Sequence, residues 1–404
     1  MIKKYIKRDL YFRRLRPFIG KNLIKVIVGQ RRVGKSYLLF QIMDELAKNG
    51  VKKDSIIYIN KELSDFGFIT NHKDLLLYIK QQEKKGKVEA IFIDEIQDIA
   101  DFEKALRHLQ ATEKYDLYCT GSNANMLSGE IATYLSGRYV EVEVFSLSFL
   151  EFLNFHKLEN NQESLWKYIR YGGLPYLINL ELSDELVYDY LRNIYNTIIL
   201  KDIIARFNVR NLAFLEKLVE FLADSVGSLV SAKKISDFLI SQKVKISANV
   251  VLNYLAYLSA AYLIFRVPRI ELKGRKIFEI NEKHFFEDLG LRHSVIKYKQ
   301  TDIGKVLENL IYMHLRVSGY KVLVGQLDGR EIDFVAEKNG KTIYIQVAYL
   351  ITDEKTKERE FGNLLAIEDN YEKIVVSMDE GIGDSNYKGI RHVHIREFLS
   401  RQTV

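Results

Sequence analysis

The feature that most constrains this chain is a glycine-bounded loop between an apolar stretch and a helical pattern. Val26–Val28 is apolar, Tyr37–Leu39 opens an amphipathic helix, and the residues between them fit G-x-x-x-x-G-K-[ST]. In this pattern the glycines let backbone N–H groups close around phosphate oxygens, and the helix directs its partly positive N-terminus at the same anion. We therefore predict a nucleotide-phosphate site formed by Gly29, Gln30, Arg31, Arg32, Val33, Gly34, Lys35, Ser36 and Tyr37.

A second apolar run ends in two carboxylates. Ala90–Ile93 is typical of a buried strand, and Asp94 and Glu95 follow it directly. Lys35 would reach the β- and γ-phosphates of the nucleotide. Asp94 would hold Mg²⁺ together with the Ser36 hydroxyl, and Glu95 would polarise the attacking water. The pattern predicts an enzyme that hydrolyses ATP, with Mg²⁺ as the metal.

A third apolar run, Asp116–Thr120, leads into small polar residues. Ser122 or Asn123 would lie beside the γ-phosphate and sense hydrolysis, and we take Asn123 as the catalytic candidate. The alternative is an ordinary turn from strand to helix with an N-cap residue. The order of the three runs along the chain favours the sensor.

Composition limits the other function classes. A chain of 404 residues exceeds one ordinary core, so two or three domains are expected. No apolar run approaches the roughly 20 residues that span a bilayer, the N-terminus lacks the apolar stretch of a signal peptide, and Cys119 is the single cysteine. These features predict a cytoplasmic protein with no membrane partner. A net charge of +7 permits contact with nucleic acid without demonstrating it.

Further segments carry a resemblance to a known family. They are Ser136-Gly137-Arg138-Tyr139, Leu147-Ser148-Phe149-Leu150-Glu151-Phe152 and Tyr171-Gly172-Gly173-Leu174-Pro175. With the loop, Ile93–Gln97 and Thr120–Asn123, they resemble the AAA-type ATPase domain of a large prokaryotic family of uncharacterised ATPases, followed by its helical domain of unknown function. The resemblance covers nearly the whole chain.

The resemblance implies a cationic group that stabilises phosphate charge during transfer. Arg138 is the first candidate for this group, with a structural salt bridge as an equally weighted alternative, and Arg206 is the second candidate. AAA-type sites often use an arginine from a neighbouring subunit, so the resemblance also makes a homo-oligomer a partner to consider.

Residues from Leu212 onward follow the order helix, helix, helix, ribbon, which is typical of a winged helix. The helices cover Leu215–Leu222, Ser231–Leu239 and Ser247–Leu255, and the ribbon covers Ile264–Ile280. On a DNA-binding interpretation, the phosphate contacts would be Lys243, Lys245, Lys273, Arg275 and Lys276. The alternative is a winged helix that packs on the ATPase or mediates assembly.

The C-terminal segment resembles the PD-(D/E)xK nuclease core. Arg330–Val335 and Thr342–Ala348 are expected to form a hairpin around Asn339-Gly340. By position, Glu308, Asp333 and Gln346 correspond to the acids of a metal site, and Ala348 stands where the family has lysine. With two charged groups missing, we expect a degenerate nuclease site that no longer cuts, although Glu331 or Glu354 could compensate.

The predicted fold is therefore mixed α/β, with four parts. An AAA-type three-layer ATPase domain covers residues 1–155, a lid-like helical connector 156–210, a winged helix 211–285 and a nuclease-like α/β domain 286–404. The predicted function is a Mg²⁺-dependent ATPase that acts as a molecular switch coupled to its C-terminal domains. A DNA-binding protein with a regulatory ATPase is the alternative, and a metal-dependent nuclease is the third hypothesis. Beyond ATP, the partners left open are DNA, a protein client and a second copy of the chain.

Overall fold

The computed structural model of the protein describes residues 5–127, 135, 137–244, 246–274, 276–380 and 385–401. The chain forms two compact units. The first consists of Met1–Phe145 with Ala260–Tyr262, and the second of Ser146–Ser259 with Leu263–Val404. None of the helices in these described ranges is both long and apolar enough to span a bilayer.

The first unit contains a five-stranded sheet in which all neighbouring strands are parallel, in the order β2-β3-β4-β1-β5. Its strands are β1 (Ile24–Val28), β2 (Ile56–Asn60), β3 (Ala90–Asp94), β4 (Asp116–Gly121) and β5 (Tyr139–Glu143). Its longer helices are α1 (Asp9–Leu15), α2 (Lys35–Lys48), α3 (His72–Glu83) and α4 (Phe102–Ala111). β1 and β3 are buried along their whole length, as their apolar runs predict.

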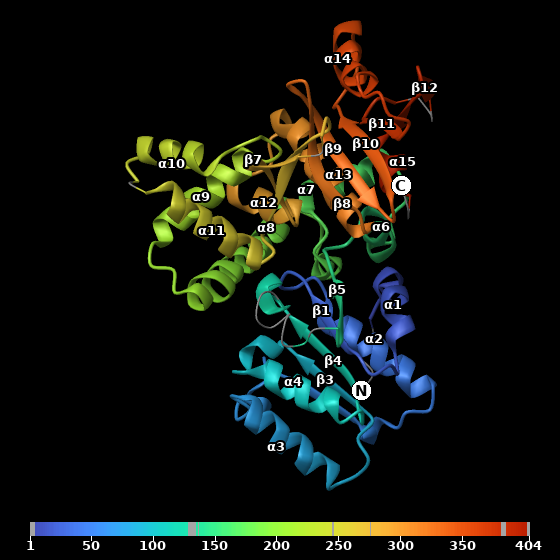
Figure 1. Cartoon of the computed structure of the whole chain (residues 1–404), viewed down its shortest axis with the longest axis vertical. Helices are drawn as coiled ribbons and strands as arrows, with labels where there is room; N and C mark the ends of the chain where they lie inside the picture. Colours follow the sequence, from blue (N-terminus) through green and yellow to red (C-terminus); the bar gives the residue numbers. More distant parts are fainter. Residues whose placement is uncertain are drawn as a thin grey trace. The chain divides into compact units, whose positions relative to one another are not determined.

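The helices of this unit cover both faces of the sheet (Figure 1). From β1 to β2 the chain moves in one direction across the sheet, and from β2 through β3 to β4 it moves back. Because crossovers between parallel strands are right-handed, α2 lies on one face while α3 and α4 lie together on the other. The three-layer arrangement predicted for this part of the chain is confirmed, and it brings the carboxyl ends of β1, β3 and β4 to one edge.

The second unit begins with helices. They are α6 (Phe149–His156), α7 (Gln162–Tyr171), α8 (Asp184–Thr197), a π-helix at Ile198–Ala205, α9 (Leu212–Asp224), α10 (Ala232–Ser241) and α11 (Ala248–Ala260). The mixed α/β class predicted for the whole chain is confirmed, and the boundaries predicted inside this unit stay a prediction.

Two of the sequence segments that carry the family resemblance have structural roles here. Ser148 and Glu151 form a capping box at the start of α6, in which each side chain accepts from the other residue's backbone N–H. Gly173 N–H donates to the Asp288 carboxylate at 2.7 Å, and a Cβ on Gly172 would lie 2.3 Å from the same carboxylate. A Cβ on Gly290 would lie 2.1 Å from the Tyr171 carbonyl, so these glycines permit a close backbone contact that larger residues would prevent.

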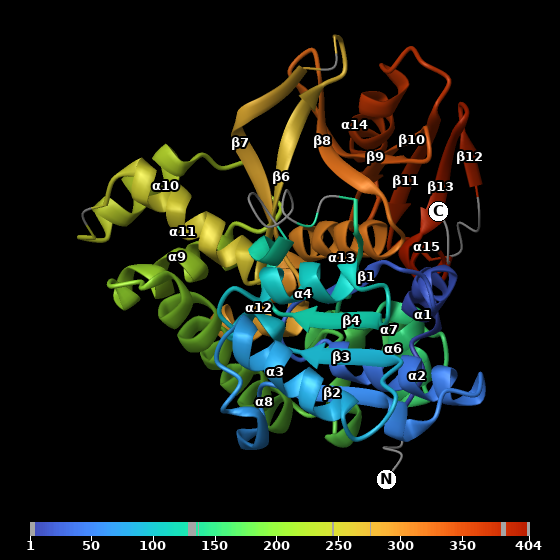
Figure 2. The same cartoon turned by 60° about the horizontal axis from the view of Figure 1, so that its bottom comes forward.

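The remainder of the second unit is built on an eight-stranded sheet in the order β12-β13-β11-β10-β9-β8-β6-β7, and Figure 2 shows this row. The strands are β6 (Ile264–Glu271), β7 (Lys276–Phe286), β8 (Lys321–Leu327), β9 (Arg330–Lys338), β10 (Lys341–Val347), β11 (Glu372–Ser377), β12 (Ser385–Tyr387) and β13 (Ile390–His394). The helices are α12 (Leu289–Ile296), α13 (Ile303–Val317), α14 (Glu354–Leu365) and α15 (Ile395–Leu399).

The ribbon that we interpreted as a wing is part of this sheet. β6 pairs with β7 as expected, but Arg269–Glu271 also pairs with Val324–Gln326 of β8. The sheet is therefore continuous across residue 285, where the sequence predicted a domain boundary. Local alternation predicts a ribbon, whereas its pairing with a strand 55 residues further along the chain depends on tertiary packing.

The hairpin around Asn339-Gly340 is present, with both residues at positive φ, 50° and 78°. Helices cover both faces of its strands. Phe334 of β9 faces Tyr312 of α13, whereas its neighbour Val335 packs in one apolar cluster with Phe361 and Leu364 of α14.

Candidate nucleotide site and a second carboxylate cluster

The glycines of the phosphate loop are required by the geometry around them. Gly29 follows β1 with φ 147°, and a Cβ at this position would lie 2.0 Å from the Val144 carbonyl oxygen. Gly34 has φ 97° and is the N-cap of α2. At Gly29, any residue with a side chain would push against Val144, which follows β5. At Gly34, the positive φ favours glycine. The loop therefore begins at Gly29, after β1, and ends at Gly34, before α2, as the spacing of the two glycines predicts.

Lys35 lies in the loop that it follows. Its side chain is almost fully buried, and Nζ donates to the carbonyls of Gly29 at 3.0 Å and Gln30 at 2.9 Å. The same nitrogen lies 3.7 Å from the Glu95 carboxylate. These contacts place an ammonium group inside the ring of backbone that the phosphate pattern predicts.

Asp94 ends β3 and is surrounded by hydroxyl groups. Its carboxylate accepts from Thr120 Oγ1 and from Tyr58 at 3.0 Å, and it is also hydrogen-bonded to Ser36. Burial raises the pKa of Asp94 above its ordinary value, and the three hydroxyls oppose the rise without cancelling it. A buried carboxylate and a hydroxyl in contact are a donor set that suits a hard divalent cation, so Ser36 and Asp94 fit the Mg²⁺ site predicted for them.

Glu95 differs from its neighbour although both are buried. Burial acts to raise its pKa, but the Lys35 ammonium, Gln97 and Arg31 outweigh it, and the pKa of Glu95 lies below its ordinary value. Gln97 Nε2 donates to this carboxylate at 2.6 Å, and the Ser122 hydroxyl is also hydrogen-bonded to it. Glu95 is therefore ionised at neutral pH, as a group that accepts a proton from water must be.

The other residues of the predicted loop have different surroundings. Gln30 is fully buried and donates to the Tyr262 carbonyl at 2.8 Å, within the same unit. Arg31 donates to Glu62 at 2.7 Å, Arg32 is exposed with φ 71°, and Val33 is buried. Tyr37 is 48% exposed on α2.

Four residues at this site were missed by the sequence interpretation. Arg8 donates to the carbonyls of Val33 at 2.8 Å and Phe145 at 2.7 Å. The N-terminal segment is therefore hydrogen-bonded to the loop and to the residues after β5. Thr120, Tyr58 and Gln97 contact the two acids as described above. The positions of Thr120 at the end of a strand and of Gln97 two residues after Glu95 are signals that could have identified them.

The two other predicted catalytic residues, Asn123 and Arg138, lie after β4 and before β5. Asn123 is half-buried in the turn after β4, where its carbonyl accepts from Met126, and Ser122 is the residue that contacts Glu95. Arg138 is exposed and precedes β5, with its carbonyl accepting from Ile24 N–H at 2.9 Å. It therefore lies at the amino ends of the parallel strands, about 16 Å from the loop at five residues of about 3.3 Å each. Within one chain, Arg138 does not reach the site.

The predicted nuclease-like residues of the second unit do come together. Asp333 of β9 accepts from Val347 N–H at 2.9 Å, and its own N–H donates to Gln346 Oε1 at 3.4 Å. Glu308 of α13 joins them through a residue that the sequence interpretation missed. Lys283 of β7 places its Nζ 2.7 Å from Glu308 and 3.1 Å from Asp333.

The two residues named as possible replacements behave differently. Glu331 lies 2.7 Å from Lys283 Nζ and completes a cluster of three carboxylates around one ammonium. Glu354 begins α14 and is 3.6 Å from Lys357, outside the cluster. Burial and the Asp333 charge raise the pKa of Glu308 to about 8, with Lys283 opposing them.

The basic residues proposed to contact DNA are only partly described. Lys243 and Lys276 are exposed, and Lys273 is paired with Asp328 at 2.7 Å. Lys245, Arg275 and Ser136 lie outside the described residues. Arg206 is 3.5 Å from Asp202 in the π-helix of the second unit.

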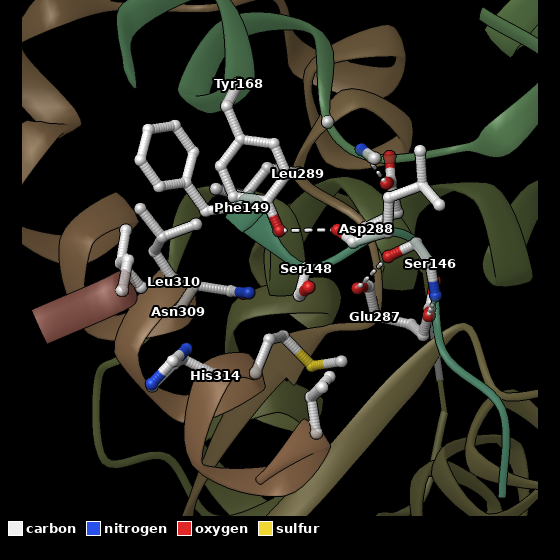
Figure 3. A pocket seen from close by; sticks show the side chains of 16 residues that line it. Ser146, Ser148, Phe149, Tyr168, Glu287, Asp288, Leu289, Asn309, Leu310 and His314 are labelled. Carbon is white, nitrogen blue, oxygen red and sulfur yellow. Dashed lines mark hydrogen bonds between the residues drawn. The ribbon is translucent and has the colours of Figure 1, made fainter. Parts of the chain in front are cut away.

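A small cavity in the second unit is lined by polar groups, several of which are hydrogen-bonded to nearby backbone (Figure 3). Ser146, Glu287 and Asp288 line one side, and Asn309 and His314 the other. Glu287 accepts from Ser146 N–H at 2.6 Å, and Asn309 both donates to and accepts from the Phe286 backbone. The cavity encloses about 20 Å³, which is room for one water molecule.

Comparisons with known proteins agree with this geometry. Residues 21–153 match an AAA domain family, and residues 162–302 match a family described as a domain of unknown function (DUF8612). An uncharacterized protein of Haemophilus influenzae is 38% identical over 405 residues, covering 99% of this chain and 100% of that protein. An uncharacterized protein of Methanocaldococcus jannaschii is 31% identical over 403 residues, covering 94% of this chain and 86% of that protein.

Among solved structures, a Walker-type ATPase of Pyrococcus abyssi has a similar fold. The TM-score is 0.52 at 17% identity, covering 72% of this chain and 96% of that chain. The parallel sheet, the phosphate loop after β1 and the two acids after β3, with the AAA domain match, define an AAA-type P-loop ATPase. The chain belongs to the family that its full-length relatives in Haemophilus influenzae and Methanocaldococcus jannaschii represent.

Proposed function

We propose that this protein hydrolyses ATP with Mg²⁺ in its first unit and that the hydrolysis cycle acts as a switch for binding functions in the second. The observation that carries the proposal is the meeting of four groups at one edge of the sheet. Lys35 and Ser36 come from the start of α2, and Asp94 and Glu95 from the end of β3. Three of the four are nearly fully buried, so their interactions with a phosphate are little screened by solvent.

Each group has a distinct role in this proposal. Lys35 donates to backbone carbonyls, which a phosphate oxygen can replace because a charged acceptor binds an ammonium more strongly. Ser36 and Asp94 would hold Mg²⁺, which neutralises phosphate charge when bound. Glu95, ionised and fixed by Gln97, accepts the proton of the attacking water.

The test is phosphate release by the purified full chain. We expect Mg²⁺-dependent ATP hydrolysis that Lys35→Ala abolishes, because no other ammonium replaces the one inside the loop. Lys48→Ala is the matched control, since Lys48 is exposed at the other end of the same helix. Failure of the wild-type chain to bind nucleotide at millimolar ATP would rule the proposal out.

For the second unit we propose a helical connector at 156–210, a winged helix at 211–285 and a nuclease-like part at 286–404, with DNA as a candidate partner. On this proposal the ribbon of the winged helix belongs to the same sheet as the nuclease-like part. One observation favours DNA. Lys233 and Lys234 in the first turn of α10, and Lys243 after its end, are all exposed. Basic side chains at both ends of such a helix are suited to contact phosphates on a duplex.

Binding of duplex DNA at several salt concentrations tests this candidate. We expect the affinity to fall as salt rises, with a smaller slope when Lys233, Lys234 and Lys243 are changed to Gln. If the triple variant binds as the wild type does, this surface is not the DNA site. A protein client or a second copy of the chain then becomes the better partner for the switch.

A further inference from the structure

The buried ammonium group of Lys283, in the second unit, contacts three acidic side chains. Lys283 Nζ lies 2.7 Å from Glu308, 2.7 Å from Glu331 and 3.1 Å from Asp333, and the side chain of Lys283 is 1% exposed. Lysine is rarely buried to this degree unless it is paired. Here one cation is surrounded by three acidic side chains, and even with Glu308 protonated the other two carry more charge than neutrality requires.

The acids are held in place by elements far apart in sequence. Glu308 projects from α13, while Glu331 and Asp333 belong to β9. The pairing of β9 with β8 shifts between Leu323 and Gly325, where β9 has one extra residue at Asp333-Phe334. Bulges of this kind redirect a side chain, and Asp333 is then fixed by Val347 N–H at 2.9 Å.

The position of Lys283 is fixed by the residues that follow it on β7. Phe285 stacks on Tyr312 of α13 with ring centroids 4.7 Å apart, and it contacts Phe334 of β9 at 5.6 Å. These contacts join β7 to the two elements that carry the acids. Because these aromatic rings are buried, they fix the backbone of β7 near Lys283 and hold its ammonium group among the acids.

The chemistry of the cluster is that of a cation site made of oxygen ligands. Carboxylates from a helix and a strand converge within hydrogen-bonding distance of one point, and that point holds a positive charge. Across the described parts of the chain, no group of three or more His, Cys, Asp or Glu side chains is arranged to hold a metal ion. With Lys283 in place, the carboxylates are spaced around an ammonium instead.

We propose that Lys283 is the built-in cation of this cluster and that its ammonium excludes divalent metal ions. The wild-type cluster is then closed to Mg²⁺ and Mn²⁺. Removing the ammonium while keeping its stem leaves three carboxylates facing one another, which favours a hard divalent cation with oxygen ligands. Lys283→Met makes this change, because methionine keeps the length of the stem and carries no charge.

The experiment measures Mn²⁺ binding to the full chain by electron paramagnetic resonance, without nucleotide. We expect Lys283→Met to bind one additional Mn²⁺ per chain, at least about tenfold tighter than any binding by the wild type. Adding Asp333→Asn should abolish that binding and so separate it from binding at Ser36 and Asp94. Lys273→Met is the matched control, because Lys273 pairs with a single exposed acid and should give no new site.

Two results would overturn the proposal. One is Mn²⁺ binding by the wild type that Asp333→Asn removes, since the ammonium would then not exclude metal. The other is a folded Lys283→Met chain that gains no Mn²⁺. If Lys283→Met does not fold alone, it is refolded with Mn²⁺. Recovery of native near-ultraviolet circular dichroism supports the proposal, and failure to recover shows that a metal cannot replace the ammonium and overturns it.

Discussion

The protein contains two sites in which a buried lysine meets carboxylates, and the two lysines are held in opposite ways. Lys35 of the first unit donates to two backbone carbonyls and lies 3.7 Å from one carboxylate, Glu95. Lys283 of the second unit is within 3.1 Å of three carboxylates. Both side chains are at least 95% buried, so burial does not distinguish them.

The difference lies in what a ligand must displace. A phosphate that approaches Lys35 replaces neutral carbonyls with a charged acceptor, which is a favourable exchange. An anion that approaches Lys283 meets a site with an excess of negative charge. The first lysine is therefore available to a ligand and the second acts as a structural counter-ion, although a sequence pattern cannot separate the two.

The largest effect should come from the acid beside the available lysine. We expect Glu95→Gln to lower the rate of ATP hydrolysis about 10²- to 10⁴-fold, the usual loss when a general base is removed. ATP affinity should remain near that of the wild type, because Lys35 and the loop are unchanged. Phosphate release and fluorescent-nucleotide binding measure the two quantities, and Glu113→Gln, at an exposed position, is the control. A wild-type rate in Glu95→Gln would remove Glu95 from the mechanism.

The counter-ion should matter for stability rather than turnover. We expect Lys283→Ala to lower the free energy of unfolding of the second unit by about 3–5 kcal/mol, because three carboxylates lose their buried partner. Trp166, the single tryptophan, lies on α7 of this unit, so its fluorescence during urea unfolding reports the change. Lys273→Ala should leave the midpoint unchanged, since its ion pair with Asp328 is exposed. Equal midpoints for both variants would contradict the counter-ion role.

The positions of the phosphate-loop pattern and of the two acids could be predicted because their determinants are local. The phosphate loop is contiguous from Gly29 to Ser36, and its geometry follows from glycine positions and the helix start. Asp94 and Glu95 follow a buried strand, and parallel strands bring such ends to one edge. The order of these segments along the chain was enough to predict that the loop and the two acids lie at the same edge of the sheet.

Other parts depended on contacts that no local pattern contains. Lys283 stands in an alternating ribbon and has no sequence neighbour that marks it as a partner of Glu308, 25 residues away. The placement of Arg138 depends on β5 running parallel to β1. This direction puts the residue before β5 at the amino ends of the strands, opposite the edge that carries the phosphate loop. The acids Glu308 and Asp333, and the amide Gln346, were found by resemblance, but the cation between the acids required the three-dimensional structure.

The pH dependence of stability offers a smaller and independent test of how the second unit is buried. Burial lowers the pKa of four histidines of the second unit, to about 4 for His156 and His314 and to about 3 for His284 and His293. Each binds a proton less readily when folded than when unfolded, so its stabilising effect is present above about pH 6.5 and is lost as the pH falls toward 4. Each can contribute up to about 1.4 kcal/mol per pH unit over that range.

Urea midpoints followed by Trp166 between pH 7.5 and 5 measure this loss. His284→Phe should flatten the dependence, because neither ring nitrogen of His284 has a hydrogen-bond partner among the described residues and phenylalanine does not titrate. A midpoint that stays constant from pH 7.5 to 5 would show that these imidazoles are not buried in solution.

The smallest effect is expected at Arg138. Its place at the amino ends of the strands, about 16 Å from the phosphate loop, leaves it unable to contact a nucleotide bound to its own chain. We expect Arg138→Ala to change the ATP affinity of dilute protein by less than about twofold, because the substitution removes no contact with the nucleotide. A tenfold loss would need a contact worth about 1.4 kcal/mol. Nucleotide titration at concentrations below any self-association measures this, with Arg31→Ala as the contrasting variant because Arg31 lies in the loop and acts on Glu95. A large loss in Arg138→Ala under these conditions would mean that the guanidinium reaches the phosphates of its own chain. A loss that appears only when the protein is concentrated would instead assign Arg138 to the site of a neighbouring copy.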